Sequence, residues 1–308
     1  MRPTDCDSAY RVNRAYDLAE ARAYCARLAR SHYENFLVGS LFVPRDLRQH
    51  FYNVYAYCRI SDDLGDETGG PDRALPLLDW WDEELHACYA GHPRHPVFVA
   101  LAETNERFDI PMEPYSDLLS AFRQDQRVTR YATYGELLGY CRFSANPVGR
   151  LVLYLCGYRD PERQGYSDAT CTALQLANFW QDVARDYDIG RIYLPLDDMA
   201  RFGVSEEDIA SRRFTPEFAE LLRFECERAQ GLFAEGSRLL PLVDRRLRLD
   251  IEMFGRGGLE ILRRIEAQGY DVLTRRPEIP RRRQLAILAG RFLAGLLHRG
   301  EGAPGRAA

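Results

Sequence analysis

The sequence lacks several residue patterns that mark common protein classes. Its eight cysteines form no Cys-x-x-Cys pair and no spacing typical of zinc sites or disulfide frameworks, so they indicate buried thiols in a reducing compartment. No Gly-x-Gly-x-x-Gly fingerprint is present, which argues against a built-in nicotinamide domain, and we expect no NADPH. The first residues lack the apolar stretch of a signal peptide, and no uncharged apolar run has the length to cross a bilayer. We therefore expect a cytoplasmic protein.

The sequence also lacks a second Glu-x-x-His motif and a positive net charge. Only one Glu-x-x-His motif occurs, from Glu83 to His86, whereas a di-iron helical bundle needs two such motifs and two further glutamates. A net charge of −5 over 308 residues argues against nucleic acid as a partner. The basic residues are unevenly distributed, because Arg275, Arg276 and residues 281–283 form an arginine cluster near the C-terminus. This cluster needs its own explanation.

Apolar residues recur with helical spacing along almost the whole chain, as in Leu47, Phe51, Val54 and Cys58. Sustained period-two alternation is hard to find, so the pattern predicts an all-α protein. The expected helices span residues 17–30, 44–66, 73–90, 95–107, 114–124, 133–156, 166–187, 205–212, 215–242, 246–268 and 281–298. No internal repeat or linker divides the chain, so we expect one helical domain over residues 1–299 and a disordered tail over residues 300–308. The sequence does not determine the oligomeric state.

Two pairs of aspartates have a spacing that places both members on one face of a helix. The pattern Asp-x-x-x-Asp occurs only twice, as Asp62 with Asp66 and as Asp182 with Asp186. The common alternative for acidic stretches is a solvated helix face. Here, however, both pairs follow apolar helical stretches that ought to be buried, and buried carboxylates require partners. Hard divalent cations are partners that offset the repulsion within each pair.

Polar residues extend each aspartate pair into a stripe along its helix. The two stripes consist of Tyr55, Arg59, Asp62 and Asp66, and of Gln175, Asn178, Asp182 and Asp186. Oxygen ligands without histidine favour Mg²⁺, or Mn²⁺ as an alternative, over zinc. Because Mg²⁺ typically joins one or two carboxylates to substrate phosphates, a diphosphate is the natural bridging ligand.

These stretches resemble the squalene and phytoene synthase family, and the similarity runs from about His32 to Gly269. Residues 55–66 look like the first Asp-rich motif of the family, and residues 175–186 look like the second. The sequence Gly-Arg-Ile-Tyr-Leu-Pro at residues 190–195 follows as in the family. The resemblance implies a single isoprenoid synthase domain with a central apolar cavity for C15-derived chains. It also implies that Mg²⁺ bridges the diphosphate of an isoprenoid substrate to both motifs.

The resemblance further implies roles for single residues. Metal would be held or oriented by Asp62, Asp66, Asn178, Asp182 and Asp186, of which the four aspartates are expected to be catalytic. Substrate would be contacted by His32, Tyr55, Arg59, Tyr140, Gln175, Arg191 and Tyr193. An arginine beside a metal-bound phosphate adds charge stabilisation as the leaving group departs. The alternative for His32 is a buried histidine that only satisfies a hydrogen bond, and Tyr193 carries a similar alternative.

Within the family, the chain is most similar to the hydroxysqualene synthases of hopanoid-producing bacteria, which ionise presqualene diphosphate and let water capture the cation. Gln181 stands where relatives often have Arg, and Asn146 stands where many have Gly. Both place a neutral amide that could orient water, so we assign both to catalysis. For Asn146, the alternative is a local role in capping or packing a helix before Pro147.

Other functions of this fold stay open at this point. Within the family they are presqualene diphosphate synthase and head-to-head phytoene or dehydrosqualene synthase. A catalytically silent assembly factor with the same fold is an alternative of another class. The retained aspartate pairs argue against it, because a scaffold need not keep like charges in a buried cavity.

The arginine cluster precedes an apolar stripe formed by Leu285, Leu288, Phe292 and Leu296. Residues 275–298 therefore fit two roles, which are peripheral docking on a membrane and closure of the helical bundle by a last helix. We favour closure of the bundle, because helices usually bury such a stripe in the core.

Overall fold

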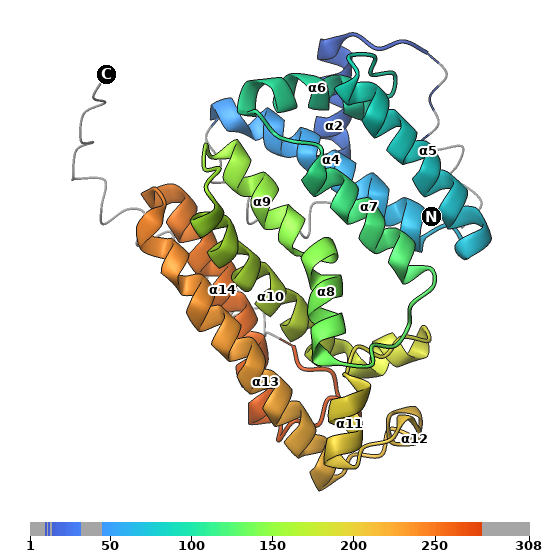
Figure 1. Cartoon of the computed structure of the whole chain (residues 1–308), viewed down its shortest axis with the longest axis vertical. Helices are drawn as coiled ribbons and strands as arrows, with labels where there is room; N and C mark the ends of the chain where they lie inside the picture. Colours follow the sequence, from blue (N-terminus) through green and yellow to red (C-terminus); the bar gives the residue numbers. More distant parts are fainter. Residues whose placement is uncertain (1–9, 11, 13, 32–44, 279–308) are drawn as a thin grey trace.

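The computed structural model describes residues 10, 12, 14–31 and 45–278 (Figure 1). Within these residues the regular elements are all helical, with no strand among them. They are α2 (Leu18–Ser31), α4 (Arg45–Asp66), α5 (Pro71–Tyr89), α6 (Pro96–Phe108), α7 (Glu113–Asp125), α8 (Tyr134–Ser144), α9 (Asn146–Leu155), α10 (Pro161–Asp188), α11 (Leu196–Phe202), α12 (Glu206–Ala210), α13 (Pro216–Gly236), the 3-10 helix η1 (Ser237–Leu242) and α14 (Arg245–Ala267). The all-α prediction is confirmed. In the part of the chain that is described, no helix combines the length and apolarity needed to span a membrane.

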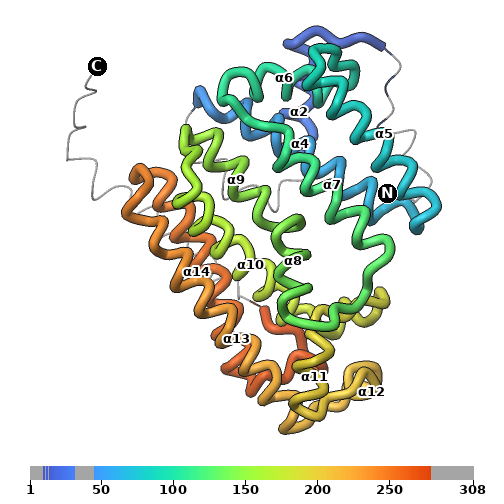
Figure 2. Tube along the Cα trace, in the orientation of Figure 1, coloured from blue at the N-terminus to red at the C-terminus, as the bar shows by residue number. Residues whose placement is uncertain are grey.

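The helices form two groups that meet at α8 and α9 (Figure 1). Helices α2, α4, α5, α6 and α7 pack around one apolar core that includes the fully buried Tyr57 and Trp81. Helices α8, α10, α11, α13 and α14 pack around a second core that includes Trp180. Helix α9 adds Leu151 and Leu155 to the first core while it packs against α10, and Figure 2 shows it between the two groups. Each group therefore contributes one helix, α4 or α10, that carries an aspartate pair.

Glycine and proline set the starts of several helices. Gly70 precedes α5 with φ at 128°, a conformation that side-chain-bearing residues rarely adopt, and Pro71 occupies the first turn. Helix α10 begins at Pro161 rather than at the expected residue 166. The reason is the cap formed by Asp160, whose side chain accepts a hydrogen bond from the backbone N–H of Arg163.

The structure differs from the expected helices in three further places. The expected helix 133–156 is divided at Ala145 into α8 and α9, because Pro147 in the first turn of α9 has no N–H to continue α8. The expected helix 215–242 is α-helical only to Gly236 and continues as η1, which contains Pro241. Helix α11 was not expected, since its seven residues are too short to show a period. The expected helix 281–298 and the tail lie outside the described residues.

Candidate active site

The first aspartate pair lies in the last turns of α4, where Arg59 anchors it. Arg59 Nη1 donates to Asp62 Oδ2 at 3.2 Å, and Nη2 donates to Glu67 Oε1 at 2.9 Å. The same guanidinium forms an ion pair with the buried Asp63. The side chains of Asp62 and Asp66 remain 44% and 45% exposed. These two carboxylates can therefore reach a ligand while the helix fixes their positions.

The second pair lies on α10 and is more enclosed. The Asp182 side chain is only 12% exposed, and both of its carboxylate oxygens accept hydrogen bonds from Arg276. Arg276 Nε lies 2.5 Å from Oδ1, and Nη2 lies 2.9 Å from Oδ2. Arg276 could be assigned no role from the sequence beyond its place in the arginine cluster. The structure explains this part of the cluster, because Arg276 pairs with an aspartate of the second motif.

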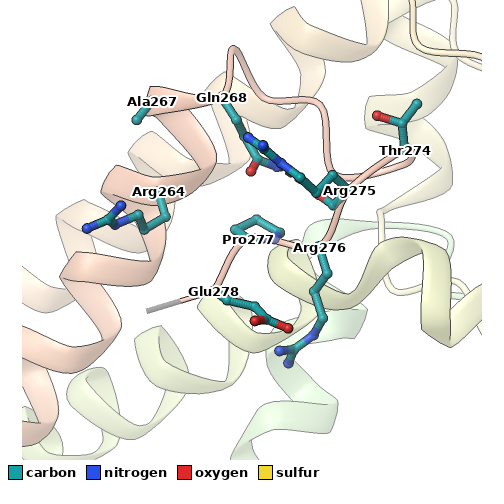
Figure 3. Close-up of a pocket in the computed structure, with 8 residues that line it drawn as sticks. All are labelled: Arg264, Ala267, Gln268, Thr274, Arg275, Arg276, Pro277 and Glu278. Atoms are coloured by element: carbon teal, nitrogen blue, oxygen red, sulfur yellow. Dashed lines mark hydrogen bonds between the residues drawn. The ribbon is translucent and has the colours of Figure 1, made fainter. Parts of the chain in front are cut away.

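Arg276 belongs to an irregular segment that follows α14. Figure 3 shows Arg275 turned toward Gln268, while Arg276 extends in another direction. The Gln268 side chain donates to the carbonyl oxygen of Arg275 at 2.9 Å. A pocket of about 730 Å³ adjoins the segment and is lined by Arg264, Ala267, Gln268 and residues 274–278. This basic pocket differs from the apolar cavity expected between the two motifs, which stays a prediction.

Arg191 joins the two aspartate pairs. Its Nη2 donates to Asp66 Oδ1 of the first motif at 3.3 Å, and its charge also acts on Asp186 of the second motif. The chain reaches this position through a turn after α10, in which Gly190 has φ at 84° and Arg191 N donates to Asp186 O at 2.8 Å. Arg191 and Asp66, which are 125 positions apart in the sequence, thus lie at one site.

One aspartate of each motif has a raised pKa. Burial, followed by the neighbouring charge of Asp66, raises the pKa of Asp62 to about 6 despite the opposing effect of Arg59. Burial and the charge of Asp182 raise the pKa of Asp186 to about 7. A raised carboxyl pKa means that the site disfavours its own negative charge. A bound cation would relieve this repulsion.

An aromatic stack flanks the site beside Arg191. The rings of Tyr193 and Phe179 lie 3.7 Å apart at an interplanar angle of 8°, and Tyr140 and Tyr131 each stack on Tyr193 with centroids 5.9 Å away. The Tyr140 hydroxyl donates to Asp125 Oδ2 at 2.8 Å. The predicted residues Tyr140 and Tyr193 are therefore brought together in one buried aromatic cluster.

Asp125 is a site residue that the sequence did not reveal. It has no second aspartate four positions away, so nothing in the local pattern distinguishes it from a surface acid. Burial raises its pKa to about 6, against the opposing effects of the Arg191 charge and the hydrogen bond from Tyr140. The charges of Asp66 and Asp62 also act on it. Asp125 is thus a third carboxylate that interacts electrostatically with the first motif.

The other predicted contact residues lie on the same two helices. Tyr55 is half-buried on α4, while on α10 Gln175 is half-buried and Asn178 is exposed. Their assignment as substrate or metal contacts stays a prediction. His32 lies outside the described residues.

The two amides assigned to catalysis are both buried and both engaged. Thr172 Oγ1 donates to Asn146 Oδ1 at 2.9 Å, and Asn146 does not cap α9, whose cap position is Ala145 and carries no side-chain cap bond. Gln181 Nε2 donates to the carbonyl oxygen of Pro277 at 2.5 Å. Gln181 therefore helps to hold the segment that carries Arg276.

The residues present fit a magnesium–diphosphate site. The two helices present carboxylate oxygens, which are the ligands that Mg²⁺ prefers. The raised pKa values of Asp62 and Asp186 show that the site disfavours further negative charge. Among the described residues, no three Asp, Glu, His or Cys side chains already form a complete metal cluster. Mg²⁺ usually keeps waters and takes phosphate oxygens as further ligands. Asp62, Asp66, Asp182 and Asp186 would hold the metal.

Comparison with known proteins identifies the family. A family model described as squalene/phytoene synthase matches residues 29–283. The chain belongs to the squalene/phytoene synthase family. Phytoene synthase of Arthrospira platensis is 31% identical over 277 residues, which cover 86% of this chain and 90% of that protein.

Two solved structures extend the comparison within the squalene/phytoene synthase family. The crystal structure of squalene synthase HpnC from Alicyclobacillus acidocaldarius is 50% identical, with a TM-score of 0.79, and covers 82% of this chain and 95% of that chain. A dehydrosqualene synthase in complex with a ligand is 26% identical, with a TM-score of 0.80, and covers 91% of this chain and 98% of that chain. The all-α synthase fold is confirmed, and the chain is an enzyme of isoprenoid biosynthesis.

Proposed function

We propose that this synthase ionises presqualene diphosphate with the help of Mg²⁺ and that water captures the rearranged cation. The products are hydroxysqualene and diphosphate, in the route to squalene and hopanoids. The observation that supports ionisation is the meeting of the two Asp-rich helices across Arg191. The 50% identity to squalene synthase HpnC supports a squalene-forming branch over a phytoene-forming one.

The chain's own groups would bind and stabilise the leaving diphosphate. When bound, Mg²⁺ would neutralise part of the diphosphate charge between the aspartate pairs, with Asn178 orienting it. Three arginines already donate hydrogen bonds to these aspartates, namely Arg59, Arg191 and Arg276. They would donate charge-assisted hydrogen bonds to phosphate oxygens as well. The sequence contains no lysine, so the fixed side-chain cations of this site are guanidiniums, which bind phosphate through two parallel hydrogen bonds. This preorganised charge stabilises the departing diphosphate.

The fate of the cation distinguishes this reaction from those of relatives. Hydride capture requires a nicotinamide, for which the sequence has no dedicated fingerprint, and proton loss requires a base near the middle of the chain. Asn146 and Gln181 offer neutral amides that orient water without being protonated themselves. The observed bonds use Asn146 Oδ1 and Gln181 Nε2. Asn146 Nδ2 and Gln181 Oε1 are therefore the atoms that would bind the water.

Product analysis in ¹⁸O-water tests the proposal. Purified protein given presqualene diphosphate and Mg²⁺ without NADPH should release diphosphate and form labelled hydroxysqualene. Squalene formed only after NADPH is added, or presqualene diphosphate formed from farnesyl diphosphate, would place the chain in another branch. Phytoene or dehydrosqualene would do the same. An Asn146→Gly variant that makes the alcohol unchanged would assign Asn146 to its Thr172 contact alone.

Membrane contact is a separate part of the proposal. A peripheral position at the inner membrane surface would suit hydrophobic substrates and products. Most of residues 275–298, which would make this contact, lie outside the described residues. Arg276, at the start of this segment, pairs with Asp182. Flotation of the full-length chain with anionic liposomes decides the matter, because absence of binding would remove the membrane role.

A further inference from the structure

Asp125 occupies the junction of three helices at the edge of the proposed site. It is the last residue of α7, which packs against both α4 and α8. Its Oδ2 accepts the hydrogen bond from the Tyr140 hydroxyl of α8 at 2.8 Å. Its Oδ1 is buried and has no hydrogen-bond partner in the described part of the chain. Leaving a buried carboxylate oxygen unpaired is unfavourable, so the position calls for an explanation.

Arg191 is a cationic side chain that could pair with this oxygen. The Arg191 guanidinium interacts electrostatically with the carboxylates of both Asp125 and Asp66, but it donates its hydrogen bond to Asp66, at 3.3 Å. Asp62 and Asp66 also act electrostatically on Asp125. Arg191 therefore lies between two carboxylates, of which one is bonded and the other has a free oxygen.

Binding of a metal at Asp66 would disturb this arrangement. Arg191 bonds Asp66 through Oδ1, so a metal that takes this oxygen would compete with the guanidinium and turn Arg191 away from Asp66. The diphosphate would accept some of the five N–H groups of Arg191, and leaving the others unpaired in a half-buried site would be unfavourable. Asp125 supplies a second carboxylate that already interacts electrostatically with Arg191, and the hydrogen bond from Tyr140 fixes its orientation.

We propose that Asp125 is a positioning residue that receives Arg191 when metal and diphosphate occupy the first aspartate pair. In this arrangement Asp125 holds Arg191 and Tyr140 together on one side of the diphosphate. The inference rests on the proposed function, because it requires a metal–diphosphate ligand. It assigns Asp125 no contact with metal or substrate.

Titration calorimetry with Mg²⁺ and inorganic pyrophosphate tests this role without relying on turnover. Asp125→Asn should weaken pyrophosphate binding in the presence of Mg²⁺ by about tenfold, which corresponds to the loss of one charge-assisted contact. Asp117→Asn is the matched control, because Asp117 lies on the same helix and interacts with Arg150 and Arg142 instead. Asp117→Asn should bind pyrophosphate within twofold of the wild type.

A double variant separates positioning from a structural effect. If Asp125 acts through Arg191, then Asp125→Asn combined with Arg191→Gln should bind no more weakly than Arg191→Gln alone. Wild-type affinity in Asp125→Asn, or losses that multiply in the double variant, would overturn the inference and leave the proposed function intact. If Asp125→Asn does not fold, Asp125→Glu replaces it with the same expected loss, since it keeps the charge and moves it. A wild-type chain that binds no pyrophosphate with Mg²⁺ would overturn the proposed function as well.

Discussion

Replacing Asp186 with asparagine should make the metal-free protein more stable, although it removes an expected metal ligand. The carboxylate is held on α10 one turn from Asp182, and burial together with that neighbouring charge raises its pKa from 3.8 to about 7. The folded chain therefore holds a proton on Asp186 more tightly than the unfolded chain does. Asparagine keeps the shape of the side chain and removes the charge that the site disfavours.

The size of the effect follows from the difference between the folded and unfolded pKa values. A rise from 3.8 to about 7 corresponds to at most about 4 kcal/mol of destabilisation above pH 7. Relaxation and solvent around a partly exposed group reduce this, so we expect a gain of about 2 kcal/mol for Asp186→Asn. For a chain of this length, the melting temperature should rise by about 4 °C.

The dependence on pH has a defined sign. Between about pH 4 and pH 7 the folded chain binds more protons at Asp186 than the unfolded chain, so its contribution makes the free energy of unfolding fall as the pH rises. Asp186→Asn should flatten this part of the profile and should gain most at pH 7 and above.

Thermal unfolding in EDTA across this pH range provides the measurement. Asp188→Asn is the control, because Asp188 is 67% exposed and forms a surface ion pair with Arg212, which should contribute less than about 1 kcal/mol. In wild-type protein, Mg²⁺ with pyrophosphate should raise the melting temperature, and in Asp186→Asn most of this rise should disappear. An Asp186→Asn variant that melts at or below the wild-type temperature at pH 8 would refute the reasoning.

Two further substitutions test the metal ligands and the helix packing. Asp62→Asn or Asp182→Asn should lower turnover by at least about 100-fold while circular dichroism stays nearly unchanged, because each removes an anionic ligand and keeps the side chain's shape. Near-normal activity at saturating Mg²⁺ would show that the residue is not a ligand. Gly236→Ala should destabilise the fold by about 1–3 kcal/mol, since the added Cβ would overlap Thr170 Oγ1 and lie 2.9 Å from its backbone nitrogen. Gly231→Ala, on the same helix with open space around it, should instead gain up to about 1 kcal/mol, and equal effects of the two variants would contradict the packing argument.

The helices that were predicted well are those whose pattern is long and local. Helix α4 ends at Asp66 as expected, because a 22-residue amphipathic run followed by Gly69 and Gly70 contains all the information needed to place its end. The division between α8 and α9 was missed because apolar spacing continues across it. Only Pro147 signalled the break, and proline is also common in the first turn of a helix. The 3-10 geometry of η1 likewise leaves little trace in the apolar period.

The candidate site divides in the same way. Asp62 with Asp66 and Asp182 with Asp186 could be predicted, since each pair is defined by a spacing of four residues within one helix. Arg276 and Asp125 could not, because their roles depend on tertiary neighbours. Arg276 meets its carboxylate across 94 positions of sequence. No local rule connects such residues, and a cluster of arginines indicates only that positive charge is needed somewhere.

The arrangement of arginines explains how the two aspartate pairs are tolerated in the folded protein when no metal is bound. Each aspartate pair concentrates negative charge, yet one carboxylate of each pair already has a guanidinium from outside its own motif, with Arg191 on Asp66 and Arg276 on Asp182. The metal-free fold is thereby spared part of the repulsion within each pair. When a metal takes those carboxylates, the same guanidiniums lie next to the incoming diphosphate, where charge-assisted hydrogen bonds to phosphate oxygens replace the ones they lose. Stability of the empty site and recognition of the ligand therefore depend on the same side chains, so a variant of Arg276 should alter both.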